Sequence, residues 1–166
     1  PFIKALLAKL RDRIPGLVIR TSLITGLPGE GEAEFQELCD FLRETKMERV
    51  GAFAFSPEEG TPAAKMEFVD TEIAQQRAET IEMIQSEIMD EWNASMVGKT
   101  LEVLVDGYDE ENEQFYGRSY ADSPDIDGRV WIASDEPVTI GNFVWVKIDG
   151  CLDGDLSGYV VEEGEQ

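Results

Sequence analysis

Hydrophobic and polar residues change their period along this chain. Apolar residues recur every three to four positions in three stretches, which predicts helices over residues 2–13, about 32–46 and about 71–96. Between them, residues 17–24 alternate with a period of two and residues 50–56 form a short apolar run. These two stretches predict strands, and we expect the second to be covered on both faces, as in a parallel sheet. Helices alternating with strands indicate α/β packing.

Beyond Gly98 the pattern changes to β-branched and aromatic residues separated by glycine, Asp and Asn turns. It predicts five short strands with no helix between them, at residues 100–105, 113–120, 129–133, 142–148 and 156–161. Five such strands favour a small closed or half-open barrel of OB-like character. We therefore expect two domains, residues 1–96 and 97–166, of class α/β and β.

The first predicted strand offers a candidate binding surface. Its alternation gives one oily face and one mixed face, which holds Arg20, Ser22, Ile24 and, one step further, Gly26. Because Gly26 has no side chain, a ligand would be able to approach the backbone there. The same spacing also fits an ordinary buried strand that ends in a glycine.

Charge is the strongest compositional signal. The chain holds 35 acidic and 14 basic residues, a net charge of -21. Residues 96–166 alone hold 17 acidic and 4 basic side chains. Since proteins grip nucleic acids by neutralising phosphates with Lys and Arg, this balance disfavours direct nucleic-acid binding and favours a cationic partner. The alternative interpretation is that the acidity only keeps the protein soluble.

Several kinds of site are excluded or disfavoured. With no histidine, the chain cannot build a Ser-His-Asp or Cys-His pair. The glycine turn at 26–31 lacks the lysine and Ser/Thr of a P-loop, and residues 123–134 lack the acidic ends of a calcium loop. Two isolated cysteines, Cys39 and Cys151, read as small buried residues in a reducing compartment. No apolar run suits a membrane span, and we expect a cytoplasmic protein.

Three segments carry a resemblance to a known family. Residues 20–30 (RTSLITGLPGE) and 49–64 (RVGAFAFSPEEGTPAA) resemble the fifth and sixth strands of the radical S-adenosylmethionine barrel in methylthiotransferases. The C-terminal barrel resembles their TRAM domain, and residues 117–128 (GRSYADSPDIDG) resemble the acidic signature of the RimO-type branch, which modifies an aspartate of a small-subunit ribosomal protein. The resemblance implies an incomplete TIM-like barrel followed by a TRAM barrel.

The resemblance also assigns roles to individual residues. Ser22, Ile24 and Gly26 match the cofactor-binding pattern of the fifth strand, and Phe55 matches an aromatic residue of the sixth strand near S-adenosylmethionine. Ser22 stands where the family pattern has glycine. The acidic segment implies four residues for docking the substrate protein, Arg118, Asp122, Asp125 and Asp127. No catalytic residue and no metal ligand is expected in this chain.

The family's cysteines for its 4Fe-4S clusters have no counterpart here, since such ligands must be thiolates clustered in space. We therefore expect the C-terminal part of a larger radical enzyme, inactive alone and with no cofactor bound. In the complete enzyme the resemblance implies S-adenosylmethionine, 4Fe-4S clusters and a basic ribosomal protein as partner, with no tRNA binding and no membrane. Two alternatives stay open: a tRNA-modifying methylthiotransferase of the MiaB type, and a non-enzymatic adaptor whose barrel binds a basic protein.

Overall fold

The computed structural model describes residues 2–162, which divide into two compact units between Met89 and Asp90. Residue 1 and residues 163–166, at the outer ends of the two predicted domains, lie outside the described residues. Within the described part of the chain, no helix is long and apolar enough to cross a membrane.

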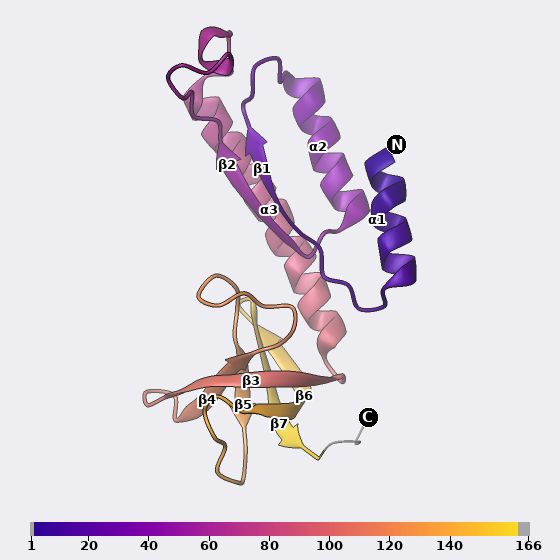
Figure 1. Ribbon diagram of the computed structural model, residues 1–166, viewed down its shortest axis with the longest axis vertical. Helices are drawn as coiled ribbons and strands as arrows, with labels where there is room; N and C mark the ends of the chain where they lie inside the picture. Colours follow the sequence, from indigo (N-terminus) through magenta and orange to yellow (C-terminus); the bar gives the residue numbers. More distant parts are fainter. Residues whose placement is uncertain (1, 163–166) are drawn as a thin grey trace. The chain divides into compact units, whose positions relative to one another are not determined.

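The first unit alternates helices with strands in the predicted order (Figure 1). Its elements are α1 (Phe2–Arg13), β1 (Arg20–Thr25), α2 (Glu32–Thr45), β2 (Arg49–Ala54), a short 3-10 turn η1 (Ala63–Lys65) and α3 (Thr71–Met96), whose last turns belong to the second unit. The sequence prediction of these helices and strands is confirmed, apart from shifts of one to three residues at their ends.

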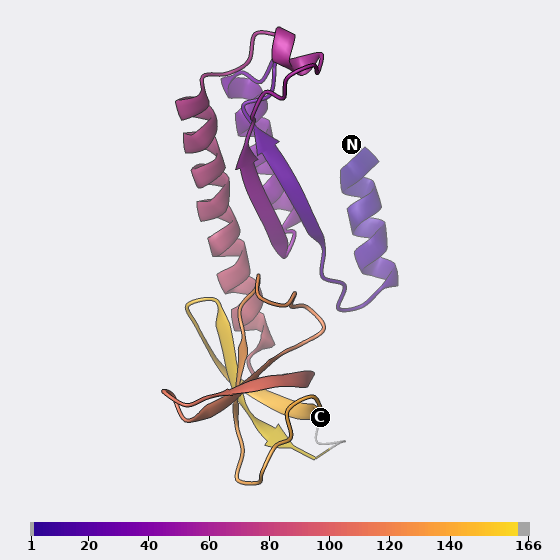
Figure 2. The same ribbon diagram turned by 60° about the vertical axis from the view of Figure 1, so that its left-hand side comes forward.

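The strands β1 and β2 pair in parallel, and α2 and α3 pack against one face of this small sheet (Figure 2). Apolar side chains from the inner sides of all four elements form one core, which includes Phe35, Leu42, Ala52, Ile81 and Ile88. The period of 3.6 on the helices and of 2 on the strands thus directs one stripe of each element inward.

The other face of the sheet is exposed, so the expectation of a second strand covered on both faces is wrong. Phe53 of β2 is 59% exposed and Ile24 of β1 is 49% exposed, and the register places them opposite each other. The sheet of β1 and β2 has two faces, and the described helices of this unit cover only one of these faces. An apolar run alone could not distinguish these cases, since it records hydrophobicity and not what lies above each face.

The second unit is a closed five-stranded barrel, as the strand spacing predicted. Its strands are β3 (Thr100–Asp109), β4 (Gln114–Arg118), β5 (Val130–Ala133), β6 (Phe143–Leu152) and β7 (Asp155–Val161). Around the barrel they follow the order β3-β4-β5-β7-β6, in which only β5 and β7 run parallel. Closure leaves no unpaired edge among these strands.

Alternate residues of each strand point into the barrel and form its core, for example Val103, Val130, Val146 and Ile148, which are all fully buried. Of the two cysteines, which the sequence predicted to be buried, only Cys39 is. Cys39 on α2 lies in the first core, where burial raises the pKa of its thiol, whereas Cys151 on β6 is exposed.

Candidate functional site

The open face of the two-stranded sheet is the first candidate surface. Ser22 and Ile24 of β1 both lie on it, as their alternation predicted, and β2 adds Gly51 and Phe53 beside them. Phe55 follows the end of β2 and is half-buried, because its ring packs edge-to-face on Phe68 with centroids 5.6 Å apart. The same alternation places Arg20, which is also exposed, on this face, so the surface combines apolar side chains with one hydroxyl group and one guanidinium.

Gly26 differs from its predicted neighbours because it is buried against α3. A Cβ at Gly26 would lie 2.3 Å from the Cβ of Ala74, and its φ of +79° lies in the left-handed region that favours glycine. Its N–H donates to Glu30 Oε1 at 2.9 Å. The requirement for glycine at this position thus follows from packing within the protein, without a ligand close to the backbone.

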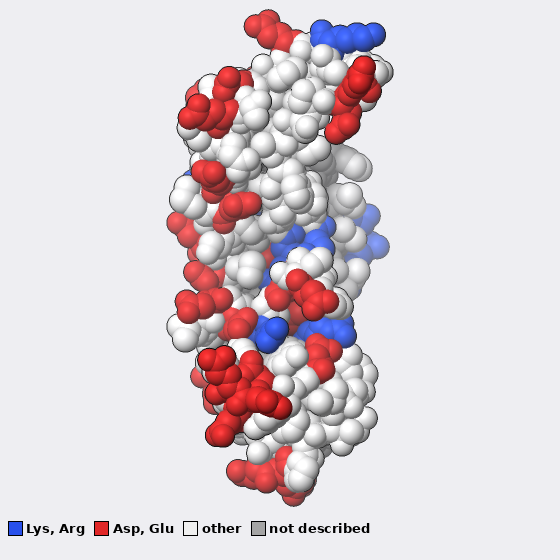
Figure 3. Space-filling view, turned by 90° about the vertical axis from the view of Figure 1, so that its left-hand side faces the viewer, with Lys and Arg blue, Asp and Glu red and all other residues white. Residues whose placement is uncertain are grey.

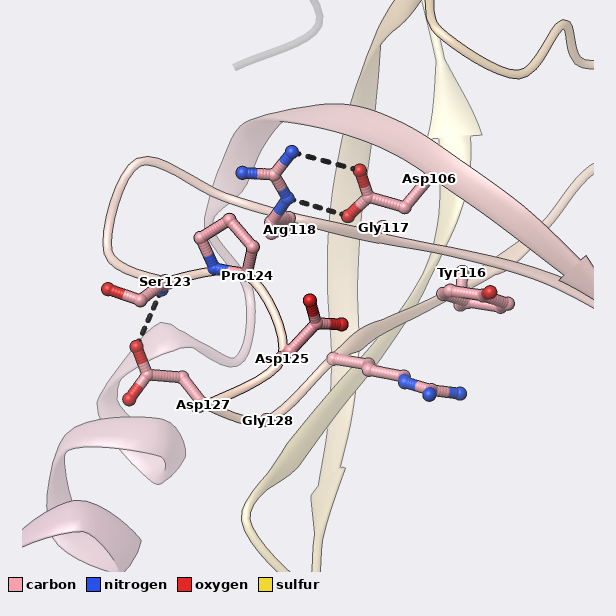
Figure 4. Close-up of a pocket in the computed structure, with 10 residues that line it drawn as sticks. Asp106, Tyr116, Gly117, Arg118, Ser123, Pro124, Asp125, Asp127 and Gly128 are labelled. Atoms are coloured by element: carbon pink, nitrogen blue, oxygen red, sulfur yellow. Dashed lines mark hydrogen bonds and ion pairs between the residues drawn. The ribbon is translucent and has the colours of Figure 1, made fainter.

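The second candidate is a pocket of about 440 Å³ on the barrel, between β4 and the loop that leads to β5 (Figure 4). Its polar lining comes from Asp106 on β3, from Arg118 on β4, and from Asp125, Asp127 and Arg129. The acidic segment identified in the sequence therefore forms one wall of a concave site. On the barrel, Asp and Glu dominate the charged surface displayed in Figure 3.

Arg118 is held by Asp106 across the pocket mouth. Its Nε and one terminal nitrogen donate to the two carboxylate oxygens at 2.8 and 3.1 Å, a bidentate pair. These hydrogen bonds raise the pKa of the Arg118 guanidinium above its ordinary value, and the charges of Asp106, Asp125 and Asp122 act in the same direction. The charge of Arg118 is thus permanent and already matched by a carboxylate.

The three aspartates of the loop play different parts. Asp122 Oδ2 accepts from the N–H and the hydroxyl of Ser119 at 2.9 and 2.7 Å, and Asp127 Oδ2 accepts from the N–H of Ser123 at 2.6 Å. Asp125 is exposed, and Figure 4 shows its carboxylate directed into the pocket while Asp127 is turned toward Ser123. Asp125 and Asp127 both line the pocket, and the carboxylates of Asp122 and Asp127 also hold the loop together. The docking role of the three aspartates stays a prediction.

Sequence reasoning missed Asp106 and Arg129. Asp106 reaches Arg118 because the pairing of β3 with β4 shifts register between Val105 and Gly107, an irregularity with no sequence signal that we could use. Arg129 lies over the ring of Tyr116, with its guanidinium carbon 4.3 Å from the ring centroid. The glycine before it and the aromatic strands around it predicted a turn but not this stacking.

The arrangement suits the binding of a cation. Its carboxylates accept hydrogen bonds and attract positive charge. Among residues 2–162, no group of three or more His, Cys, Asp or Glu side chains is placed to hold a metal ion. The pocket is therefore a candidate contact surface for a positively charged partner.

Comparison with known proteins identifies the domain that the barrel forms. A model of the TRAM domain matches residues 97–161, which span the barrel. The chain is 45% identical over 159 residues to the ribosomal protein uS12 methylthiotransferase RimO of Clostridium botulinum (strain Hall), covering 95% of this chain and 35% of that protein. The proteins of the same name from Desulforamulus reducens and Acetivibrio thermocellus are 44% and 41% identical, with 36% of each covered. The chain thus spans about a third of the length of these relatives, is homologous to these uS12 methylthiotransferases over that third, and contains a TRAM domain at residues 97–161.

Proposed function

We propose that this chain is the C-terminal part of a methylthiotransferase that modifies an aspartate of ribosomal protein uS12, and that its barrel docks that basic protein. The observation that carries the proposal is the identity of 41 to 45% to enzymes named for this reaction, over nearly the whole chain. Such an enzyme would work in the cytoplasm, where ribosomal proteins are found, and would need neither a membrane nor tRNA.

The first unit would contribute one segment of a radical S-adenosylmethionine barrel. Ser22 and Ile24 share the exposed sheet face with Phe53 and fit contact with an adenosyl group, while Gly26 would act indirectly by letting β1 end close to α3. Phe55, held by Phe68, would border the same surface. When bound, S-adenosylmethionine and a 4Fe-4S cluster supply the radical chemistry that an unactivated C–H bond requires.

The described residues of this chain do not fit an iron–sulfur cluster. Cys39 is buried in the core of the first unit and Cys151 is exposed on the barrel, so they belong to different compact units. A cluster needs thiolates gathered around it. We therefore assign cluster binding to the two thirds of the relatives' length that this chain does not span.

Docking by the barrel is supported by its charge. The residues from 96 onward carry 17 acidic and 4 basic side chains, and Arg118 among the basic ones is paired with Asp106. A surface of this kind repels phosphates and attracts a basic protein, mainly by raising the association rate and rejecting anionic competitors. Asp125 is the loop carboxylate best placed to meet the partner, because it is exposed and points into the pocket.

The test compares binding of this chain to purified uS12 and to tRNA across a salt titration. We expect binding to uS12 that weakens as the Debye length falls from about 10 Å at 0.1 M to about 3 Å at 1 M salt. Asp125→Asn should weaken it further, by about 1.4-fold to fivefold, as an exposed ion pair contributes about 0.2–1 kcal/mol. The matched control is Glu111→Gln, which also removes one exposed charge but lies in the turn between β3 and β4.

Asp122→Ala serves as a second control, because it should lower stability rather than binding. It removes the acceptor of two hydrogen bonds from Ser119, each worth about 0.5–3 kcal/mol. Tighter binding to tRNA than to uS12 would favour the tRNA-modifying alternative. Binding to uS12 that ignores both salt and Asp125→Asn would contradict electrostatic docking by the loop.

A further inference from the structure

A second hollow, of about 430 Å³, lies on the outer surface of the barrel where β3 pairs with β6. Three of its lining residues, Arg118, Ser119 and Tyr120, belong to the acidic segment 117–128, and the others come from β3 and β6. We call it the aromatic groove. The residues that matter for its chemistry are Glu102, Leu104, Arg118, Tyr120, Phe143 and Trp145.

The strand register explains why these side chains meet. Glu102 lies opposite Trp145, and Leu104 lies opposite Phe143, in the antiparallel pairing of β3 with β6. Their neighbours Val103 and Val146 are buried in the barrel core, so the period of two turns Glu102 and Phe143 outward.

The groove exposes aromatic rings that the core does not use. Phe143 is 63% exposed and Tyr120 is 62% exposed, whereas Trp145 is half-buried. Aromatic residues of this kind are enriched at the centre of protein interfaces, and exposed apolar patches mark contact sites.

Charge decides which partner suits these rings. Arg118 at one end is neutralised by the bidentate contact with Asp106, which leaves Glu102 as the charge beside the rings. The face of an aromatic ring attracts cations, and a carboxylate next to it strengthens that preference. We propose that the aromatic groove captures an Arg or Lys side chain of a basic protein, with the cation over Phe143 or Trp145 and close to Glu102.

The inference rests on the proposed function, since it gives the docking of a basic protein a second contact besides the acidic loop. Nucleic-acid bases also stack on exposed aromatic rings. Here a phosphate backbone would have to approach a barrel with 17 acidic and 4 basic residues, which makes a protein ligand the better fit.

The experiment measures binding of the whole chain to purified uS12 for two pairs of variants. Phe143→Ala removes an exposed ring from the groove, and Leu152→Ala, also on β6 and 76% exposed, is its control outside the groove. Glu102→Gln removes the carboxylate, and Glu111→Gln is its control for the loss of one charge. We expect a three- to thirtyfold weaker affinity for Phe143→Ala, the range of a cation–π contact. Glu102→Gln should weaken binding more than Glu111→Gln.

A second readout does not depend on any variant. On titration of the unaltered chain with uS12, the indole resonance of Trp145 should shift more than that of Trp131, whose indole N–H donates to Asp155 at 2.8 Å. Circular dichroism of each variant checks that the barrel is folded.

The outcomes separate the two proposals. If the unaltered chain does not bind uS12, the docking function itself fails. If the chain binds but the groove variants match their controls and Trp145 does not respond, the docking function stands and the aromatic groove is overturned. If the chain binds a single-stranded RNA, and Phe143→Ala abolishes that binding but leaves the affinity for uS12 unchanged, the groove stacks nucleic-acid bases and the proposal is overturned.

Discussion

Gly26 directly follows β1, at the point where the chain contacts the first turn of α3. Its left-handed φ and the nearness of Ala74 restrict the position to glycine for two independent reasons. Gly29, three residues later, shares the left-handed φ, at +87°, but a Cβ at this position would meet no other atom within 4 Å. Substitutions at these two positions can therefore distinguish the cost of a left-handed backbone from the cost of close packing.

Gly26→Ala should destabilise the first unit by about 2–5 kcal/mol. About 1–2 kcal/mol arises from a left-handed alanine, and about 1–3 kcal/mol from overpacking against Ala74. Gly29→Ala should cost only the first of these. Urea unfolding followed by circular dichroism at 222 nm measures both, because the long helices dominate that signal. Equal losses for the two variants would show that Ala74 moves aside easily.

The loop aspartates show at the same scale why residue type alone did not predict the site. Asp122, Asp125 and Asp127 look alike in sequence, yet Asp122 and Asp127 accept hydrogen bonds from the loop's own backbone, whereas the carboxylate of Asp125 is directed into the pocket. Asp side chains bond local N–H groups as readily as they meet a partner. Which of these occurs depends on the loop conformation, which the spacing of the aspartates does not determine.

At the scale of elements, Arg77 fastens α3 to the loop before α2. Its guanidinium donates to the backbone oxygen of Glu30 at 3.1 Å and to the Glu30 carboxylate at 2.9 Å, and it lies 5.0 Å from the ring centroid of Phe35. Both charged side chains are nearly buried. A local sequence pattern could not predict this pair, since Glu30 is 47 positions away from Arg77.

Arg77→Met should destabilise the chain by about 3–5 kcal/mol, because it leaves the buried carboxylate of Glu30 without its counter-charge. Adding Glu30→Gln should recover part of the loss, as the amide needs no counter-charge. The control is Arg43→Met, which removes an exposed ion pair with Asp40 and should change stability by less than about 1 kcal/mol. Urea unfolding of the four chains provides the comparison, and a loss for Arg77→Met no larger than that for Arg43→Met would contradict it.

The elements themselves were predicted well because each follows a local period. The helix over residues 71–96 and the five strands of the barrel came from patterns within short windows, and both are confirmed. The features that were missed depend on distant residues. The aromatic groove requires the pairing of Glu102 with Trp145, and the open sheet face depends on which helices reach Phe53. Neither can be read from one window of sequence.

At the scale of the molecule, α3 contributes to both compact units. Ile81 and Ile88 lie in the core of the first unit, whereas Met96 lies in the barrel core with Trp92 packed against it. The side chain of Asn93, almost fully buried, donates to the backbone oxygen of Gly154 at 3.1 Å. The last two turns of the helix therefore cover the barrel, and the compact units divide before them, after Met89.

The domain boundary at residues 96 and 97, which the sequence suggested from the change of period, stays a prediction that fragments can test. A chain of residues 90–166 keeps Trp92, Asn93 and Met96, whereas one of residues 97–166 loses them and opens one side of the core. Removal of a buried side chain of this size costs about 2–5 kcal/mol. For a domain of this length, each 1 kcal/mol shifts the midpoint of thermal unfolding by about 4–8 °C. We therefore expect the longer fragment to melt at least about 8 °C higher.

Thermal unfolding followed by circular dichroism and by the tryptophan fluorescence of the barrel measures this difference. Residues 83–166 serve as the control, because they add helix that belongs to the first unit and should melt with residues 90–166. If residues 97–166 melt at the same temperature as the longer fragments, the contacts of Trp92, Asn93 and Met96 contribute little and the boundary after residue 96 is the correct one. If they melt lower, the barrel begins inside α3, and one continuous helix serves as the last element of one unit and the first of the next.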